Sequence, residues 1–102
     1  MVAPAFAQPA AVAFEREVRP LLKQYCLTCH SAAAHAGDLN LERFVSLTDV
    51  LKDPRPWQKV VEQLSLGEMP PKPMPQPAPA DRVRLVAWAN AALNTAAQAQ
   101  AG

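Results

Sequence analysis

Apolar positions near the start of the chain recur at helical spacing. Phe14, Val18, Leu21, Leu22 and Tyr25 share one face of a helical wheel, and the charged residues between them fall on other faces. Such a stripe is typical of an amphipathic helix. Pro20 interrupts it, because proline lacks a backbone donor and crowds the preceding turn. The pattern therefore predicts a kinked helix that ends just before residue 26.

Three further helices are predicted downstream. Residues 46–52 form a short helix that Asp53 and Pro54 end. The next helix has Pro56 in its first turn and Gly67 at its end, positions that suit these residue types. Its apolar face contains Trp57, Val60, Val61 and Leu64.

The last predicted helix spans residues 79–97, with an apolar face of Leu85, Trp88, Ala89, Ala92 and Leu93. No segment shows convincing alternation of apolar and polar residues, which would indicate strands. The fold class is therefore all-α.

The segment "EMPPKPMPQPAPA", residues 68–80, separates the last two predicted helices. It contains six of the eleven prolines of the chain. Because proline withholds its N–H, the segment can be neither helix nor sheet interior. Such a run favours extended polyproline II geometry.

The domain organisation predicted from these patterns is simple. Residues 1–11 form a disordered arm, 12–97 one domain, and 98–102 a frayed tail. Within the arm, Ala5-Phe6-Ala7 precedes Gln8 in the A-x-A form that a signal peptidase accepts. We interpret residues 2–7 as the remnant of a signal peptide. This interpretation predicts a periplasmic or otherwise exported protein, and the alternative is a disordered arm rich in alanine and proline.

Composition narrows the possible partners. The chain has 102 residues and a net charge of +1, which is too balanced to indicate nucleic acid or an anionic membrane as a partner. No stretch is long and apolar enough to span a bilayer. Many of the apolar residues are alanine, so a buried cofactor could supply missing core volume.

The candidate chemistry is concentrated in "CLTCH", residues 26–30, which has the spacing C-x-x-C-H. Cys26 and Cys29 are the only cysteines of the chain. Three kinds of site use such residues: a structural zinc site, a redox disulfide and covalent haem attachment. Zinc needs four ligands, usually from two separated pairs, and here all candidates lie within ten residues. A thioredoxin-like pair belongs in a βαβ setting, which the helical pattern does not offer.

Covalent haem c uses every part of the motif. Both thiols add to the haem vinyl groups, and the adjacent His30 ligates the iron. The candidates for the sixth ligand are Met69, Met74 and His35. His35 follows His30 too closely to reach the opposite haem face easily. Met69 is preferred to Met74, because Pro70 and Pro71 stiffen the backbone next to it.

The chain resembles class I cytochromes c, and more narrowly the planctomycete-type cytochrome c domain. The matching segments are "FEREVRPLLKQYCLTCH" (14–30), "GDLNLERF" (37–44), "WQKVVEQLSLGEMPP" (57–71) and "LVAWANAAL" (85–93). The resemblance implies several short helices wrapped around one covalently bound haem, with the N- and C-terminal helices crossing. It also implies His30 and Met69 as the iron ligands. Asp38 departs from the family, which often has a second glycine there.

Other residues have expected roles around the haem. Leu39, Leu41, Leu64 and Leu66 are expected to line its faces. Trp57 is a candidate donor to a haem propionate, with helix anchoring as the alternative. Arg55 and Lys72 are candidate propionate partners, with a solvated charge as the alternative for each. Trp88 is expected to pack against Phe14 or Val18.

These observations predict a monohaem c-type cytochrome, an electron-transfer protein rather than an enzyme. It would carry single electrons by outer-sphere transfer, as a small carrier or as the electron-entry module of a larger redox protein. The expected partner is a redox protein, and the chain is expected to be a monomer. The alternative is a haem-based sensor or peroxidase-like site with a labile sixth ligand.

Overall fold

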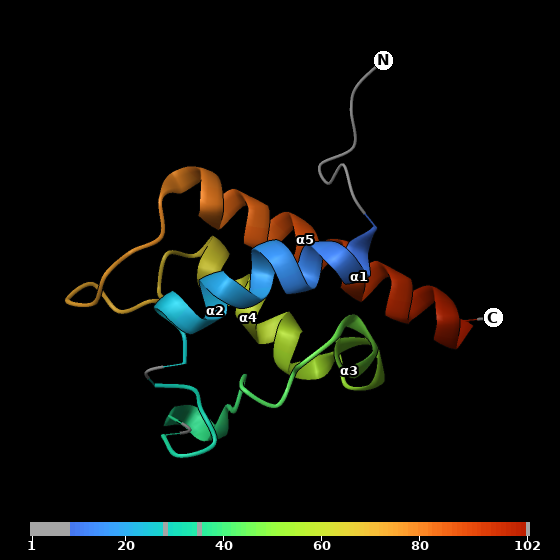
Figure 1. Cartoon of the computed structure of the whole chain (residues 1–102), viewed down its shortest axis with the longest axis horizontal. Helices are drawn as coiled ribbons and strands as arrows, with labels where there is room; N and C mark the ends of the chain where they lie inside the picture. The colour runs from blue at the N-terminus through green and yellow to red at the C-terminus, as the bar shows by residue number, and fades with distance from the viewer. Residues whose placement is uncertain (1–8, 28, 35, 102) are drawn as a thin grey trace.

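Figure 1 shows the computed structural model of the chain, which describes residues 9–27, 29–34 and 36–101. The predicted signal-peptide remnant and His35 lie outside these residues. Helices dominate the described part of the chain, where no strand is present. The prediction of an all-α chain is confirmed to this extent.

The first part of the chain forms one nearly continuous helical segment. It consists of α1 (Ala10–Ala13), a π-helical turn η1 (Phe14–Val18) and α2 (Arg19–Tyr25). A short 3₁₀ turn η2 (Ala36–Asp38) follows, and then come α3 (Leu47–Lys52), α4 (Arg55–Ser65) and α5 (Pro79–Ala101). The helix begins inside the predicted arm, at Ala10, and α5 extends past the predicted end at residue 97. Alanine and glutamine, which dominate the end of α5, are good helix formers.

Where the sequence predicts a kink at Pro20, the structure has a π-helical turn directly before α2. The N–H of Arg19 donates to the carbonyl of Phe14, five residues earlier. In an α-helix the ring of Pro20 would collide with the carbonyl of Arg16 and leave it without a donor. The wider turn just before Pro20 accommodates the ring without ending the helix.

Local signals begin α3 and end α4, and of these the sequence analysis predicted the second, at Gly67. Asp49 of α3 accepts hydrogen bonds from the N–H groups of Val45 and Ser46, at 2.9 and 3.2 Å. These bonds satisfy donors at the start of the helix. Gly67, just after α4, has a φ of 73°, a conformation that glycine adopts without steric cost. The end of α4 is therefore fixed by one residue.

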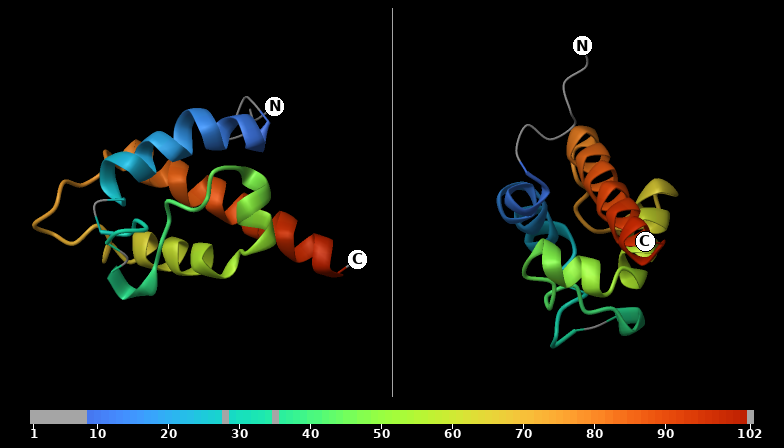
Figure 2. Two further views of the ribbon diagram at one scale, coloured as in Figure 1. Left: turned by 60° about the horizontal axis from the view of Figure 1, so that its bottom comes forward. Right: turned by 90° about the vertical axis from the view of Figure 1, so that its right-hand side faces the viewer.

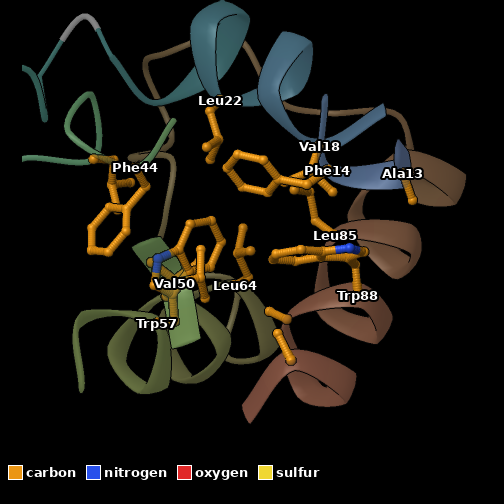
Figure 3. Packing of buried hydrophobic residues seen from close by; sticks show 14 residues of the cluster. Ala13, Phe14, Val18, Leu22, Phe44, Val50, Trp57, Leu64, Leu85 and Trp88 are labelled. Atoms are coloured by element: carbon orange, nitrogen blue, oxygen red, sulfur yellow. The ribbon is translucent and has the colours of Figure 1, made fainter. Parts of the chain in front are cut away.

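An aromatic cluster forms the centre of the core (Figure 3). Trp57 of α4 contacts Phe14, Phe44 and Trp88, with ring centroids 6.2, 5.6 and 5.6 Å away. Phe14 and Trp88 lie 5.0 Å apart, which confirms the predicted contact between the first and last helices. The indole N–H of Trp88 also donates to the carbonyl of Ala10 at 3.1 Å. These contacts join the two ends of the described chain.

The helices pack so that two long loops meet at one end of the molecule. α5 contacts α4, α3 and η1, and α3 also contacts α1. In Figures 1 and 2 the loop after α2 and the proline-rich loop between α4 and α5 both lie at the end away from the C-terminus. None of the described helices has the length and hydropathy needed to cross a membrane.

Candidate functional site

A cavity of about 250 Å³ lies between α2, α4 and the two loops. Its lining contains both cysteines of the chain, the imidazole of His30 and the thioethers of Met69 and Met74. The remaining lining is largely apolar. The sequence separates these groups by up to 48 positions, and the fold brings them to one space.

The two thiols enter the cavity from the turn that follows α2. The N–H of Cys26 donates to Leu22, and the carbonyl of Cys26 accepts from the N–H groups of Cys29 and His30, at 3.3 and 2.9 Å. Both thiols are free. Burial raises the pKa of Cys26 to about 11, so its thiol is neutral at neutral pH. A neutral sulfur in a desolvated wall is suited to an apolar ligand.

His30 is held at three points. Its N–H donates to Cys26, its carbonyl accepts from Leu41 at 2.7 Å, and its Nδ1 lies 3.0 Å from the carbonyl oxygen of Ala36. A carbonyl can only accept, so Nδ1 carries the proton in this contact. The lone pair is then on Nε2, the arrangement typical of a metal-ligating histidine whose other nitrogen is hydrogen-bonded.

The loop that carries Ala36 depends on two unusual backbone conformations. Gly37 and Asp38 have φ values of 64° and 59°. Positive φ favours glycine, and aspartate is among the few other residues that tolerate it. The sequence analysis noted Asp38 as a departure from an expected glycine, and its φ shows a turn that glycine would also tolerate.

The two thioethers belong to the loop that follows α4. The carbonyl of Gln63 accepts from the N–H groups of Glu68 and Met69, at 2.9 and 3.3 Å, so Met69 is tied directly to the last turns of α4. Met74 lies farther along the loop, and its N–H donates to Pro71 at 2.8 Å. Both methionines line the cavity. The lining of the cavity alone does not show which of the two methionines is the iron ligand.

The apolar walls agree in part with the sequence analysis. Leu39, Leu41 and Leu64 line the cavity, together with Leu22, Val60 and Leu85, for which the sequence analysis predicted no role in the site. Leu66 does not line it and is 65% exposed. The expectation for Leu66 was wrong, because this residue follows the last turn of α4 and leaves the apolar face that contains Leu64.

Trp57 belongs to the aromatic core and is not among the residues that line the cavity. Its indole Nε1 is buried without a hydrogen-bond partner among the described residues. A buried donor without a partner costs free energy, and most buried donors in proteins therefore have an acceptor. The indole N–H of Trp57 is an exception among the described residues. Its predicted role as a donor to a propionate stays a prediction.

Polar residues of α4 that the sequence analysis missed also reach the cavity. Lys59, Glu62 and Gln63 line it beside Val60 and Leu64. Helical spacing from Val60 and Leu64 was the available signal, since neighbouring faces of one helix can border the same space. Arg55 and Lys72, the predicted propionate partners, do not line the cavity.

The donor set fits covalent haem. Two thiols, one imidazole with a free Nε2 and two thioethers around an apolar space are the groups by which c-type haem is attached and ligated.

Comparison with known proteins agrees with this chemistry. The planctomycete cytochrome C family matches residues 26–73, which include the thiols, His30 and Met69. Neither the curated proteins nor the solved structures gave a match. Cytochrome c domains have covalent haem c and function in electron transfer. Residues 26–73 of this chain are thus similar to the planctomycete-type cytochrome c domain.

Proposed function

We propose that this protein is a monohaem c-type cytochrome that carries single electrons by outer-sphere transfer. It acts as a small carrier or as the electron-entry module of a larger redox protein. The observation that carries the proposal is the lining of one largely apolar cavity, to which the C-x-x-C-H turn and two methionines all contribute.

Cys26 and Cys29 hold the haem in this proposal. Each thiol would be joined to a former vinyl group of the haem, with its sulfur on one carbon and its hydrogen on the other. No electrons are gained or lost, so the reaction needs only reduced thiols. The free thiols of this turn meet that requirement. One motif of this kind supports a single haem per chain.

His30, through Nε2, and Met69, through its sulfur, are the proposed iron ligands. Bound haem supplies a reversible one-electron iron couple. Ligation by histidine and methionine would raise the reduction potential of the iron and leave no ligand position open, which favours electron transfer over substrate binding. Met69 is preferred because its N–H is hydrogen-bonded to α4, whereas Met74 lies farther out on the loop.

We also propose that the protein is exported to the periplasm and passes electrons to or from another redox protein as a monomer. The support for export is Ala5-Phe6-Ala7 before Gln8, the A-x-A form that a signal peptidase accepts, together with the C-x-x-C-H motif of covalent haem attachment.

The test is to express the protein together with a haem-attachment system and to measure its mass and absorption spectrum. The mass should exceed that of the polypeptide by one haem. The ferric protein should show the weak red absorption band of methionine–iron bonding. Met69→Ala should remove this band, and Met74→Ala should keep it. Leu66→Ala, an exposed neighbour outside the cavity, is the matched control.

Three results would contradict parts of this proposal. A colourless protein with the mass of the bare polypeptide would exclude the haem. Loss of the band only in Met74→Ala would reassign the ligand. Rapid binding of carbon monoxide by the ferrous wild-type protein would instead indicate the sensor or peroxidase-like alternative.

A further inference from the structure

The loop between α4 and α5 carries both methionines but few hydrogen-bond donors of its own. Six prolines lie between residues 70 and 79. Proline contributes a carbonyl and no N–H, so the backbone of this loop has many more acceptors than donors. Apart from the bond from Met74 to Pro71, the backbone of the loop cannot be stabilised by a regular series of hydrogen bonds between its own residues. Donors must come from side chains.

Arg82, in the second turn of α5, provides the first set of donors. Its Nη1 donates to the carbonyl of Leu64 at 3.1 Å and to the carbonyl of Met69 at 2.9 Å. One guanidinium nitrogen therefore joins α5 to the last turn of α4 and to the backbone of the proposed ligand. Hydrogen bonds from a charged donor are stronger than those between neutral groups.

Gln76 provides the second set. Its Oε1 accepts from Nη2 of Arg82 at 2.8 Å, and its Nε2 lies 2.9, 3.1 and 3.1 Å from the carbonyls of Pro70, Pro71 and Met74. The orientation of this amide follows from chemistry. Arginine only donates, so Oε1 must face it and the NH₂ group must face the carbonyls.

We propose that Arg82 and Gln76 are positioning residues that set methionine ligation. Arg82 fixes the backbone of Met69, and Gln76 holds the rest of the loop against Arg82. The proposal rests on the proposed function, since it concerns the approach of Met69 to the iron. Neither residue lines the cavity, so each acts through the loop and not by contact with the haem.

The two residues have unequal expected effects. Loss of the Arg82 side chain removes the bond to Met69 directly and also removes the partner of Gln76. Loss of the Gln76 side chain frees the carbonyls of Pro70, Pro71 and Met74 but leaves the bond from Arg82 to Met69. If Met69 is the ligand, Arg82→Ala must weaken methionine ligation more than Gln76→Ala.

The experiment compares haem-loaded wild type, Arg82→Ala, Arg82→Lys and Gln76→Ala. The readouts are the ferric methionine–iron band, the reduction potential and the rate of carbon monoxide binding to the ferrous form. Arg84→Ala is the matched control, because Arg84 lies on the same helix and pairs with Glu17 away from the loop. Urea unfolding of every variant separates loop effects from global stability.

For Arg82→Ala we expect a weaker band, a lower potential and carbon monoxide binding about tenfold faster, as expected for loss of charged hydrogen bonds. Arg82→Lys should restore part of the wild-type behaviour, since lysine keeps the charge without the fork. Gln76→Ala should give a smaller change, and Arg84→Ala none.

The proposal would be overturned if Arg82→Ala had the same absorption spectrum and the same rate of carbon monoxide binding as wild type. Equal changes in Arg82→Ala and Arg84→Ala, in proportion to lost stability, would overturn it as well. These failures are distinct from failure of the proposed function, in which the wild-type protein itself lacks haem or the methionine band.

Discussion

Single residues in this protein take conformations that their side chains must tolerate. Asp38 has a φ of 59° beside Gly37 with a φ of 64°, and the carbonyl of Ala36 just before them holds His30. The backbone at these positions therefore supports the orientation of the imidazole.

Substitutions at Asp38 should depend on tolerance of positive φ. Asp38→Gly should change the free energy of unfolding by less than about 0.5 kcal/mol, because relief of the backbone offsets the greater freedom of the unfolded chain. Asp38→Val should lower it by about 1–2 kcal/mol, the cost of a left-handed conformation for an ordinary residue. Urea unfolding measures both free energies. If Asp38→Val were as stable as wild type, the positive φ assigned to residue 38 would be contradicted.

At the level of elements, the short helix α3 depends on its first turn. Asp49 accepts hydrogen bonds from Val45 and Ser46, and these bonds hold the pKa of its carboxyl below the ordinary value, the bond from Val45 most strongly. The ionised form therefore stabilises the fold. This contribution is complete above the ordinary aspartate pKa of about 4 and is lost as the pH falls through the lower pKa of the folded state.

We expect Asp49→Asn to remove this part of the acid dependence. The variant should be less stable than wild type at neutral pH, and the difference should shrink as the pH falls below about 4. Thermal unfolding between neutral and acidic pH measures it. Ser46→Ala removes only one of the lesser causes of the lowered Asp49 pKa, so this variant should keep most of the acid dependence of wild type. Parallel curves for wild type and Asp49→Asn would contradict the prediction.

The molecule as a whole is closed by contacts between its first and last helices. Trp88 packs against Phe14 and Trp57 and donates to Ala10, so one side chain joins α5 to α4 and to the N-terminal segment. In a small domain such a residue carries a large share of the stability.

Truncation of Trp88 should therefore be severe. Trp88→Ala should lower the free energy of unfolding by about 3–5 kcal/mol, as for other buried aromatic residues. Trp88→Phe keeps a ring but loses the bond to Ala10 and should cost about 1 kcal/mol from that bond alone. Val83→Ala, at a position 68% exposed on the same helix, should change little. Similar stabilities for Trp88→Ala and Val83→Ala, measured in urea, would contradict this ranking.

The sequence predicted features that depend on neighbours along the chain. The spacing of Cys26, Cys29 and His30, the helical stripes and the end of α4 at Gly67 are local signals. The sequence could not show that Trp57 belongs to the core and Val60 to the cavity wall, because both residues lie on the same apolar face of one helix. It also missed Arg82, whose contacts with Leu64 and Met69 span 18 and 13 positions and leave no periodic pattern.

Under the proposed function, the compact turn that contains Cys26, Cys29 and His30 bears on how haem is attached to the newly made chain. The thiols and His30 belong to a single turn closed by bonds to the carbonyl of Cys26. An enzyme that joins haem to this chain could therefore recognise a short peptide before α4 and α5 are in place. The hydrogen bonds that hold Met69, to Gln63 of α4 and from Arg82 of α5, form only when those helices have docked. The colour of the newly made protein would thus record two stages, attachment first and completion of the fold afterwards.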